Sequence, residues 1–167
     1  LHDALPISTG GIIAELKNER NIRYLTSEEI PESVKDAFVS VEDKRFYKHS
    51  GVDLKRTLSA GVNYFLNFSD SYGGSTITQQ LIKNLTGEDD ATIQRKLQEI
   101  LRALYLERTL EEQYGDYEDP KYETKKHIIE TYMNTIFLSQ SAYGVQAASQ
   151  TYFSKDVSEL TLVEAAA

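Results

Sequence analysis

The stretch EDKRFYKHSGVD, residues 42–53, contains the residue types from which an enzyme can build a general base. Glu42 is a carboxylate that could accept a proton, and Phe46 close to it could exclude water and raise its pKa into a useful range. His49 could hydrogen-bond a carboxylate, although a single histidine is more often structural. Taken alone, the stretch is more typical of a solvated helix end, where basic residues complement the helix dipole.

A second stretch, GGSTITQQLIKN at residues 73–84, has the features of an anion-binding helix start. Its glycines allow close approach of the backbone, the first turn offers free N–H groups, and Ser75 and Thr76 add hydroxyls. Lys83 follows about two turns later and could reach a phosphate. No Gly-Lys-Ser/Thr follows the glycines, so this is not a Walker loop. The plainer interpretation is a capped helix with a polar exposed face.

Two further groups of polar residues lie on predicted helices. Arg95 and Glu99 stand four residues apart, as do many solvated pairs, so a functional interpretation requires Glu99 to face a cleft beside Arg95 and Lys96. Glu130 and Asn134 share another helix face, one turn apart.

The pattern of apolar residues indicates a mainly α domain that carries these groups. Helical spacing predicts helices over residues 31–43, 54–72, 75–84, 92–114, 123–138 and from 145 onward. In the helix over 92–114, one apolar face consists of Leu97, Ile100, Leu101 and Leu104. Residues 11–16 and 22–25 predict a small β-hairpin around the turn KNERN.

Length and composition fit a single globular domain. The chain has 167 residues, 40% of them hydrophobic, and a formal charge of −8 that argues against nucleic-acid binding. It has no cysteine, which excludes disulfides and thiolate chemistry. Residues 1–8 do not continue into the strand pattern, so we expect a non-native leader there and one domain over 9–167. The last helix begins at Thr161 with a capping box to Glu164 and stops within a turn, so we expect a domain truncated at its C-terminus.

Five motifs in one order give the sequence a family resemblance. They are E-D-x-x-F-x-x-H-x-G-[VI]-D, G-x-S-T-I-T-Q-Q-L-x-K-N, R-K-x-x-E, I-x-E-x-Y-x-N and L-x-L-x-E-A-A, which begin at residues 42, 73, 95, 128 and 160. In these motifs the sequence resembles glycosyltransferase family 51, the peptidoglycan polymerase domain of class A penicillin-binding proteins and of monofunctional transglycosylases. Two positions depart from the family pattern. Ser139 and Ser141 stand where members often have glycines, and Ala91 stands where some have an arginine.

The resemblance implies a fold and a reaction. The fold would be a lysozyme-like helical domain in which the apolar segment Leu54–Phe68 forms a jaw that touches the bilayer. The reaction would polymerise lipid II into β1,4-linked glycan with inversion and release of undecaprenyl pyrophosphate. Glu42 would be the general base, with Phe46 and His49 on either side of it. Glu99 would be the second essential carboxylate, which orients cations or a metal. The implied substrate-binding residues are Asp43, Phe46, His49, Ser75, Thr76, Gln79, Gln80, Lys83, Arg95, Lys96, Glu130 and Asn134.

The leaving group explains the implied set of cations. Pyrophosphate leaves as a stable anion and needs positive charge more than a proton, which suits basic side chains and a divalent cation, Mg²⁺ or Mn²⁺. The implied partners are lipid II, the growing glycan, the outer face of the bacterial cell membrane and, in a longer parent, a transpeptidase domain. Two alternatives remain: a lysozyme-like lytic enzyme, which would not need a pyrophosphate cradle, and an inactive scaffold beside the membrane.

Overall fold

The computed structural model describes residues 4–6, 12–15, 23–58, 74–87 and 92–167. In these ranges the chain is mainly helical, as predicted. The helices are α1 (Glu32–Glu42), α3 (Ile77–Thr86), α4 (Ile93–Gln113), α5 (Pro120–Thr135), α6 (Val145–Phe153) and α7 (Leu162–Ala165), with a short helical segment at residues 54–58 and a 3-10 turn, η1, at Val157–Glu159.

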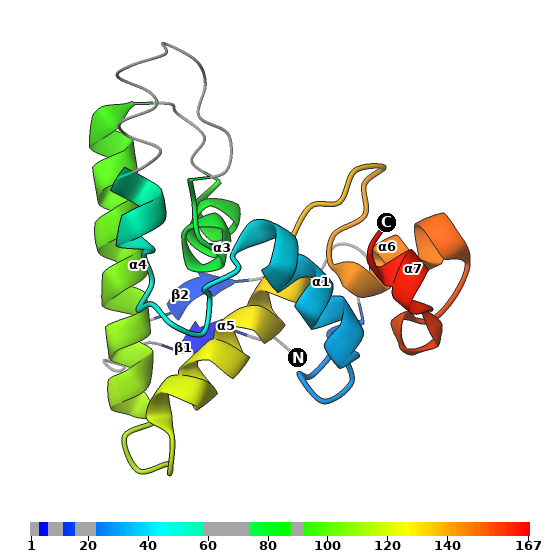
Figure 1. Ribbon diagram of the computed structural model, residues 1–167, viewed down its shortest axis with the longest axis horizontal. Coiled ribbons are helices and arrows are strands. Elements are labelled where there is room, and N and C mark those ends of the chain that lie inside the picture. Colours follow the sequence, from blue (N-terminus) through cyan, green and yellow to red (C-terminus); the bar gives the residue numbers. More distant parts are fainter. Residues whose placement is uncertain (1–3, 7–11, 16–22, 59–73, 88–91) are drawn as a thin grey trace.

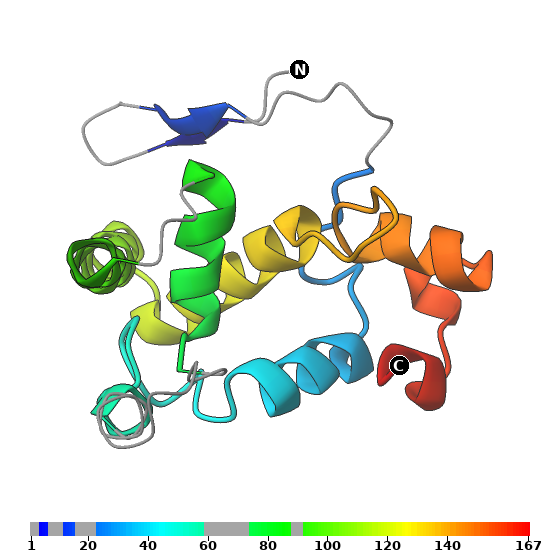
Figure 2. The same cartoon turned by 90° about the horizontal axis from the view of Figure 1, so that it is seen from above.

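Helix α5 runs through the middle of the domain. Figure 1 and Figure 2 both show α3 and α4 toward one end of the domain and α6 and α7 toward the other end. Its buried residues Ile128, Ile129, Tyr132 and Met133 pack with Ile77 and Leu81 of α3 and Val34 of α1 in the main hydrophobic core. The central helix therefore holds α1 and α3 in fixed positions, and the first two motifs lie at the ends of these two helices.

Local sequence signals set the helix starts. Thr76 and Gln79 form the predicted capping box of α3, and Thr161 and Glu164 form that of α7. Helix α5 begins with Asp119 as N-cap and Pro120 in its first turn. These caps need only neighbours in the chain, which is why the sequence alone predicted both capping boxes correctly.

The N-terminal hairpin pairs differently from the prediction. Strand β2 (Ile12–Glu15) pairs antiparallel with β1 (Ala4–Pro6), which lies in the stretch assigned to a leader. The expected partner is not a strand from residue 23 to 25. Instead, the N–H of Leu25 donates to Asn134 Oδ1 at 2.9 Å, and its carbonyl accepts from Asn134 Nδ2 at 2.8 Å. The amide side chain thus replaces a neighbouring strand as the partner of this backbone.

The apolar face predicted for α4 is mostly exposed. Leu97 and Leu101 have exposed fractions of 56% and 57%, whereas the buried residues of the helix are Ala103, Glu107 and Leu110. The rotation is set by contacts that the pattern does not contain. Gly51 packs so tightly on the helix that a Cβ there would lie 2.5 Å from the carbonyl oxygen of Ala103. This side of α4 must therefore face inward, and the leucine stripe faces outward.

A buried ion pair joins α4 to α5. Lys125 Nζ donates to Glu107 Oε1 at 2.7 Å, the Thr78 hydroxyl donates to the same oxygen at 2.6 Å, and both charged side chains are fully buried. Burial lowers the pKa of Lys125, opposed by the charge of Glu107. Lys125 Nζ also lies 4.5 Å from the centre of the Phe46 ring. The pair thus connects the first motif with three helices.

Replacing Lys125 with Met should destabilise the domain strongly, because Glu107 would keep a buried charge without its cation. We expect the free energy of unfolding to fall by about 3 to 5 kcal/mol in urea titrations. The control is Arg108→Ala, which removes an exposed pair with Glu112 and should change it by less than about 1 kcal/mol. Equal effects of the two variants would show that the buried pair is not a structural requirement.

The loop after α5 has left-handed backbone at residues that are not glycine. The φ angles of Ser139, Gln140 and Ser141 are 69°, 43° and 61°. Ser139 and Ser141 stand at the positions where the family often has glycine. The backbone there has the left-handed conformation that favours glycine, although the residues are serines.

Ser139→Gly should therefore stabilise the domain, by about 0.5 to 1 kcal/mol in thermal or urea unfolding. The matched control is Ser40→Gly in the last turn of α1. The backbone is helical there, so glycine should be destabilising. A destabilised Ser139→Gly variant would contradict the assigned loop conformation.

Candidate active site

Glu42 is the last residue of α1, and its side chain is half-buried. Gln80, in the first turn of α3, donates from Nε2 to Glu42 Oε2 at 2.8 Å. The Arg56 guanidinium donates to the backbone carbonyl of Glu42, so the end of α1 is fixed from a second direction. Among the residues that the structure describes, Glu42 Oε1 accepts no hydrogen bond. The carboxylate is thus held by one oxygen, and the other can accept a proton.

Asp43 has a structural role next to this carboxylate. It is fully buried, its Oδ2 lies 2.9 Å from His49 Nε2, and it accepts from the N–H of Ile77 at 3.1 Å. The pair therefore anchors the loop after α1 to the start of α3. Phe46 is fully buried in the main core. The expectation that Phe46 and His49 surround Glu42 is thus corrected, because His49 pairs with Asp43 and Phe46 packs in the core.

Further polar contacts hold the first motif together and join it to the start of α3. Arg45 donates to both oxygens of Asp53, with Nε 2.7 Å from Oδ2, and this guanidinium lowers the pKa of Asp53 to about 2. The Thr76 hydroxyl donates to the carbonyl of Gly51 at 2.6 Å. Gln79 Oε1 accepts from the N–H of Thr76 at 2.9 Å. Thr76 and Gln79 are both fully buried and hold the start of α3, and their contact with substrate stays a prediction.

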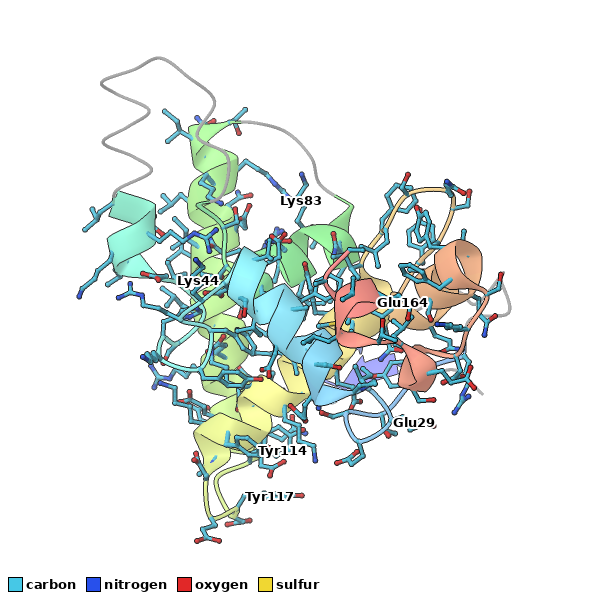
Figure 3. The ribbon with its side chains drawn as sticks, turned by 45° about the vertical axis from the view of Figure 1, so that its right-hand side comes forward. Glu29, Lys44, Lys83, Tyr114, Tyr117 and Glu164 are labelled. Carbon is cyan, nitrogen blue, oxygen red and sulfur yellow. The ribbon has the colours of Figure 1, made fainter. Side chains whose placement is uncertain are left out.

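A group of polar and basic side chains lies where α3 and α4 begin. Lys96 Nζ donates to Ser75 Oγ at 2.7 Å and to Glu99 Oε1 at 2.5 Å, which links the second and third motifs. Arg95 is half-buried on the same turn of α4. Figure 3 shows Lys83 projecting from α3 at the end of the domain where α4 begins. We call Ser75, Arg95, Lys96 and Glu99 the cation cluster; Lys83 is exposed on the neighbouring helix α3.

Glu130 and Asn134 lie elsewhere and bind the chain itself. Glu130 accepts from the Tyr24 hydroxyl at 2.9 Å and from the N–H of Ser27 at 2.7 Å. The Asn134 amide brackets Leu25, as described above. Both predicted substrate ligands therefore clamp residues 24–27 onto α5. The sequence did not indicate these contacts, because the partners are more than 100 residues apart.

The residue that sequence reasoning missed is Tyr132. It is fully buried in α5, and its hydroxyl donates to Gln80 Oε1 at 3.0 Å. Burial, and then the charge of Glu42, raise the pKa of the Tyr132 phenol, so it remains a donor at neutral pH. Its place in the motif I-x-E-x-Y-x-N was visible, but its apolar neighbours in the sequence indicated only a core position.

A cavity of about 760 Å³ opens beside Glu42, between α1, α6 and α7. Its walls are mostly apolar and include Phe38, Val41 and Tyr152. Glu164 lines it as well, and its hydrogen bond from Lys155 lowers the pKa of this second carboxyl to about 2. Glu42 therefore lies between an apolar cavity on the side of α6 and Gln80 on the side of α3.

The described residues do not form a closed metal site. Within these ranges, no three His, Asp or Glu side chains gather closely enough to hold an ion. Glu99, the carboxylate of the cation cluster, already pairs with Lys96, whereas Mg²⁺ prefers about six oxygen ligands. The divalent cation therefore stays a prediction. The described part of the chain also has no helix long and apolar enough to cross a membrane.

The described site thus combines a half-buried carboxylate, held by Gln80 of α3, with a lysine of α4 that donates to Ser75 just before α3. Comparison with known proteins gives the particular class: the family model for transglycosylases matches residues 9–167, and the chain belongs to this family. The predicted family resemblance is thereby confirmed.

The relatives are class A penicillin-binding proteins. The chain is 43% identical over 152 residues to penicillin-binding protein 1A of Clostridium perfringens. The matched region is 88% of this chain and 20% of that protein. It is 41% identical over 157 residues to penicillin-binding protein 1F of Bacillus subtilis, and this matched region is 94% of the chain and 20% of the relative. Penicillin-binding protein 1A of Aquifex aeolicus is 43% identical over 143 residues, 86% of this chain and 18% of the relative. The chain thus spans about a fifth of these relatives.

Proposed function

We propose that this domain is a peptidoglycan glycosyltransferase that joins lipid II units into a β1,4-linked glycan and releases undecaprenyl pyrophosphate. The single observation that supports this best is the position of Glu42. One of its oxygens is held by Gln80, the other accepts no hydrogen bond from the described residues, and a helix away the cation cluster gathers positive charge.

In the proposed reaction Glu42 acts on the acceptor sugar. Its carboxylate removes the proton of the 4-hydroxyl as that oxygen attacks the anomeric carbon of the donor, so that a β-glycosidic bond forms while the α bond to pyrophosphate breaks. Attack from the face opposite to the leaving group inverts the configuration. The electron pair of the broken bond leaves with the pyrophosphate, and the proton stays on Glu42 until solvent removes it.

The cation cluster would bind the departing pyrophosphate. Lys96 and Arg95, together with Lys83 of α3, supply positive charge where negative charge develops, and the Ser75 hydroxyl adds a hydrogen bond. Glu99 would orient Lys96, with which it forms an ion pair, and we do not assign it the role of general acid. A divalent cation, Mg²⁺ or Mn²⁺, could add its charge to that of the cluster when pyrophosphate is bound. Since a pyrophosphate leaving group needs no proton, one base and a set of cations are sufficient.

The exposed apolar side chains support work at a lipid surface. Ile93, Leu97 and Leu101 form an exposed stripe along α4. Leu54 and Leu58 are exposed in the first residues of the predicted jaw. Residues 59–68 of that jaw lie outside the described residues. We infer that these faces rest on the outer surface of the bacterial cell membrane, where the lipid tail of the substrate would be held. A transpeptidase domain would belong to a longer parent chain.

The test of this function separates a polymerase from a lytic enzyme. The chain is incubated with labelled lipid II in detergent and Mg²⁺, and in parallel with finished uncross-linked glycan, and products are resolved by gel electrophoresis. We expect a ladder of lengthening strands in the first reaction and no shortening in the second. Shortened glycan would favour the lysozyme-like alternative, and no change in either would favour the inactive scaffold.

A further inference from the structure

Tyr132 has an unusual combination of burial and polarity. It is the largest of the fully buried side chains in the described residues, and its ring packs edge-on against Phe38 with 6.1 Å between the ring centres. A hydroxyl at this depth needs a hydrogen-bond partner. The partner is Gln80, 52 residues away in the chain, and Gln80 is the residue that holds Glu42.

The chemistry of the three groups fixes the direction of this chain of hydrogen bonds. An ionised carboxylate only accepts, so the Gln80 atom beside Glu42 must be the Nε2 amide nitrogen. The carbonyl end of the same amide then faces Tyr132, and a carbonyl also only accepts. The phenol must therefore donate, and its hydroxyl prevents Gln80 from turning its oxygen toward Glu42.

We propose that Tyr132 is a positioning residue for the general base: through Gln80 it holds Glu42 Oε2 and leaves Oε1 directed to the acceptor hydroxyl. This inference rests on the proposed function, which supplies the base. Tyr132 touches neither sugar in this account. Its effect is to keep one amide in one orientation, and thereby one carboxylate in one rotamer.

The other charges near Glu42 do not replace this contact. The Arg56 guanidinium on the segment 54–58 donates to the backbone carbonyl of Glu42, and the neighbouring Asp43 is occupied by His49 and α3. From α5, the group that faces Glu42 is the Tyr132 phenol itself. In the described residues, Gln80 is thus the one side chain that hydrogen-bonds the carboxylate of Glu42.

The kinetic test is a double-mutant cycle on the full chain with lipid II as substrate. Tyr132→Phe should lower kcat about tenfold to a hundredfold, with KM changed less than about threefold, because the base is misplaced while substrate contacts remain. Gln80→Ala should lower kcat at least as much. In the Gln80→Ala background, Tyr132→Phe should have no further effect, because the two residues act in series.

Tyr114→Phe is the matched control. Tyr114 follows the last residue of α4, and its hydroxyl lies 3.1 Å from Nδ1 of His127 on α5. Its removal is thus the loss of a hydrogen-bonded phenol hydroxyl outside the site. Its kcat should equal that of the unmodified chain. If Tyr132→Phe behaves like this control, or lowers kcat by the same factor with and without Gln80, the proposal is wrong.

A second measurement tests the hydrogen-bond chain even if the chain makes no glycan. The pKa of Glu42 is followed by NMR of ¹³C-labelled carboxyl groups in the unmodified chain and in the same variants. Loss of a donor to the carboxylate favours its protonated form, so Tyr132→Phe and Gln80→Ala should each raise the pKa of Glu42, and Tyr114→Phe should not. An unchanged pKa in Tyr132→Phe would overturn the positioning role, whereas a raised pKa without activity would contradict only the proposed function.

Discussion

Glu42→Gln should reduce the rate of glycan formation about a thousandfold, which is the usual scale for loss of a well-placed general base. The amide has almost the shape of the carboxylate and can still bond to Gln80, so binding of lipid II should be preserved. The loss should therefore fall on kcat, with KM nearly unchanged. The measurement is the initial rate of polymer formation from labelled lipid II.

The control for this variant is Glu32→Gln at the opposite end of the same helix. Glu32 pairs with Lys35 one turn away and is exposed, so its loss changes the charge of α1 without touching the site. Its rate should match that of the unmodified chain. A Glu42→Gln variant that polymerises at a similar rate would refute the assignment of the base.

Lys96→Met should have the next largest effect, a loss of about a hundredfold to a thousandfold in kcat/KM. Lys96 is the centre of the cation cluster, since it bonds to both Ser75 and Glu99. Removing it takes away a charge that would face the departing pyrophosphate and leaves Glu99 as an uncompensated anion in the same place. The loss should be seen in kcat as well as in KM, because negative charge on the pyrophosphate grows as the bond breaks.

Lys126→Met is the matched control for the cation cluster, because Lys126 also pairs with a glutamate, Glu28, but does so on α5 away from the site. We expect the rate of this control to be unchanged. Glu99→Gln should resemble a weaker form of Lys96→Met, since it releases the lysine without removing its charge. If Glu99→Gln were instead far more damaging than Lys96→Met, Glu99 would have a role beyond orienting the lysine.

Features that depend on near neighbours in the chain were predictable from the sequence. The capping boxes at Thr76 and Thr161 and the helical course of the chain follow from residues three or four positions apart. The pair of Glu99 was only partly predictable. Its spacing indicated Arg95, four residues away, whereas the structure pairs it with Lys96, three residues away.

Features that depend on distant partners were not predictable in this way. The periodicity of α4 showed an apolar stripe but not which side would face the core, because Gly51 and Lys125, both far away in the sequence, decide that rotation. The polar residues of the fourth motif looked suited to bind substrate, yet Asn134 binds Leu25 at a separation of 109 residues. Tyr132 was assigned to the core for the same reason, because its contact with Gln80 joins two helices.

The release of undecaprenyl pyrophosphate during strand growth is the most direct test of the proposed reaction. Lipid II labelled in both its lipid and its sugar is incubated with the chain, and both products are counted over time. We expect one undecaprenyl pyrophosphate for each new glycosidic bond, with both rates falling together in Glu42→Gln. Release of the lipid carrier without strand growth, or a well-folded chain that forms neither product, would contradict the proposed reaction.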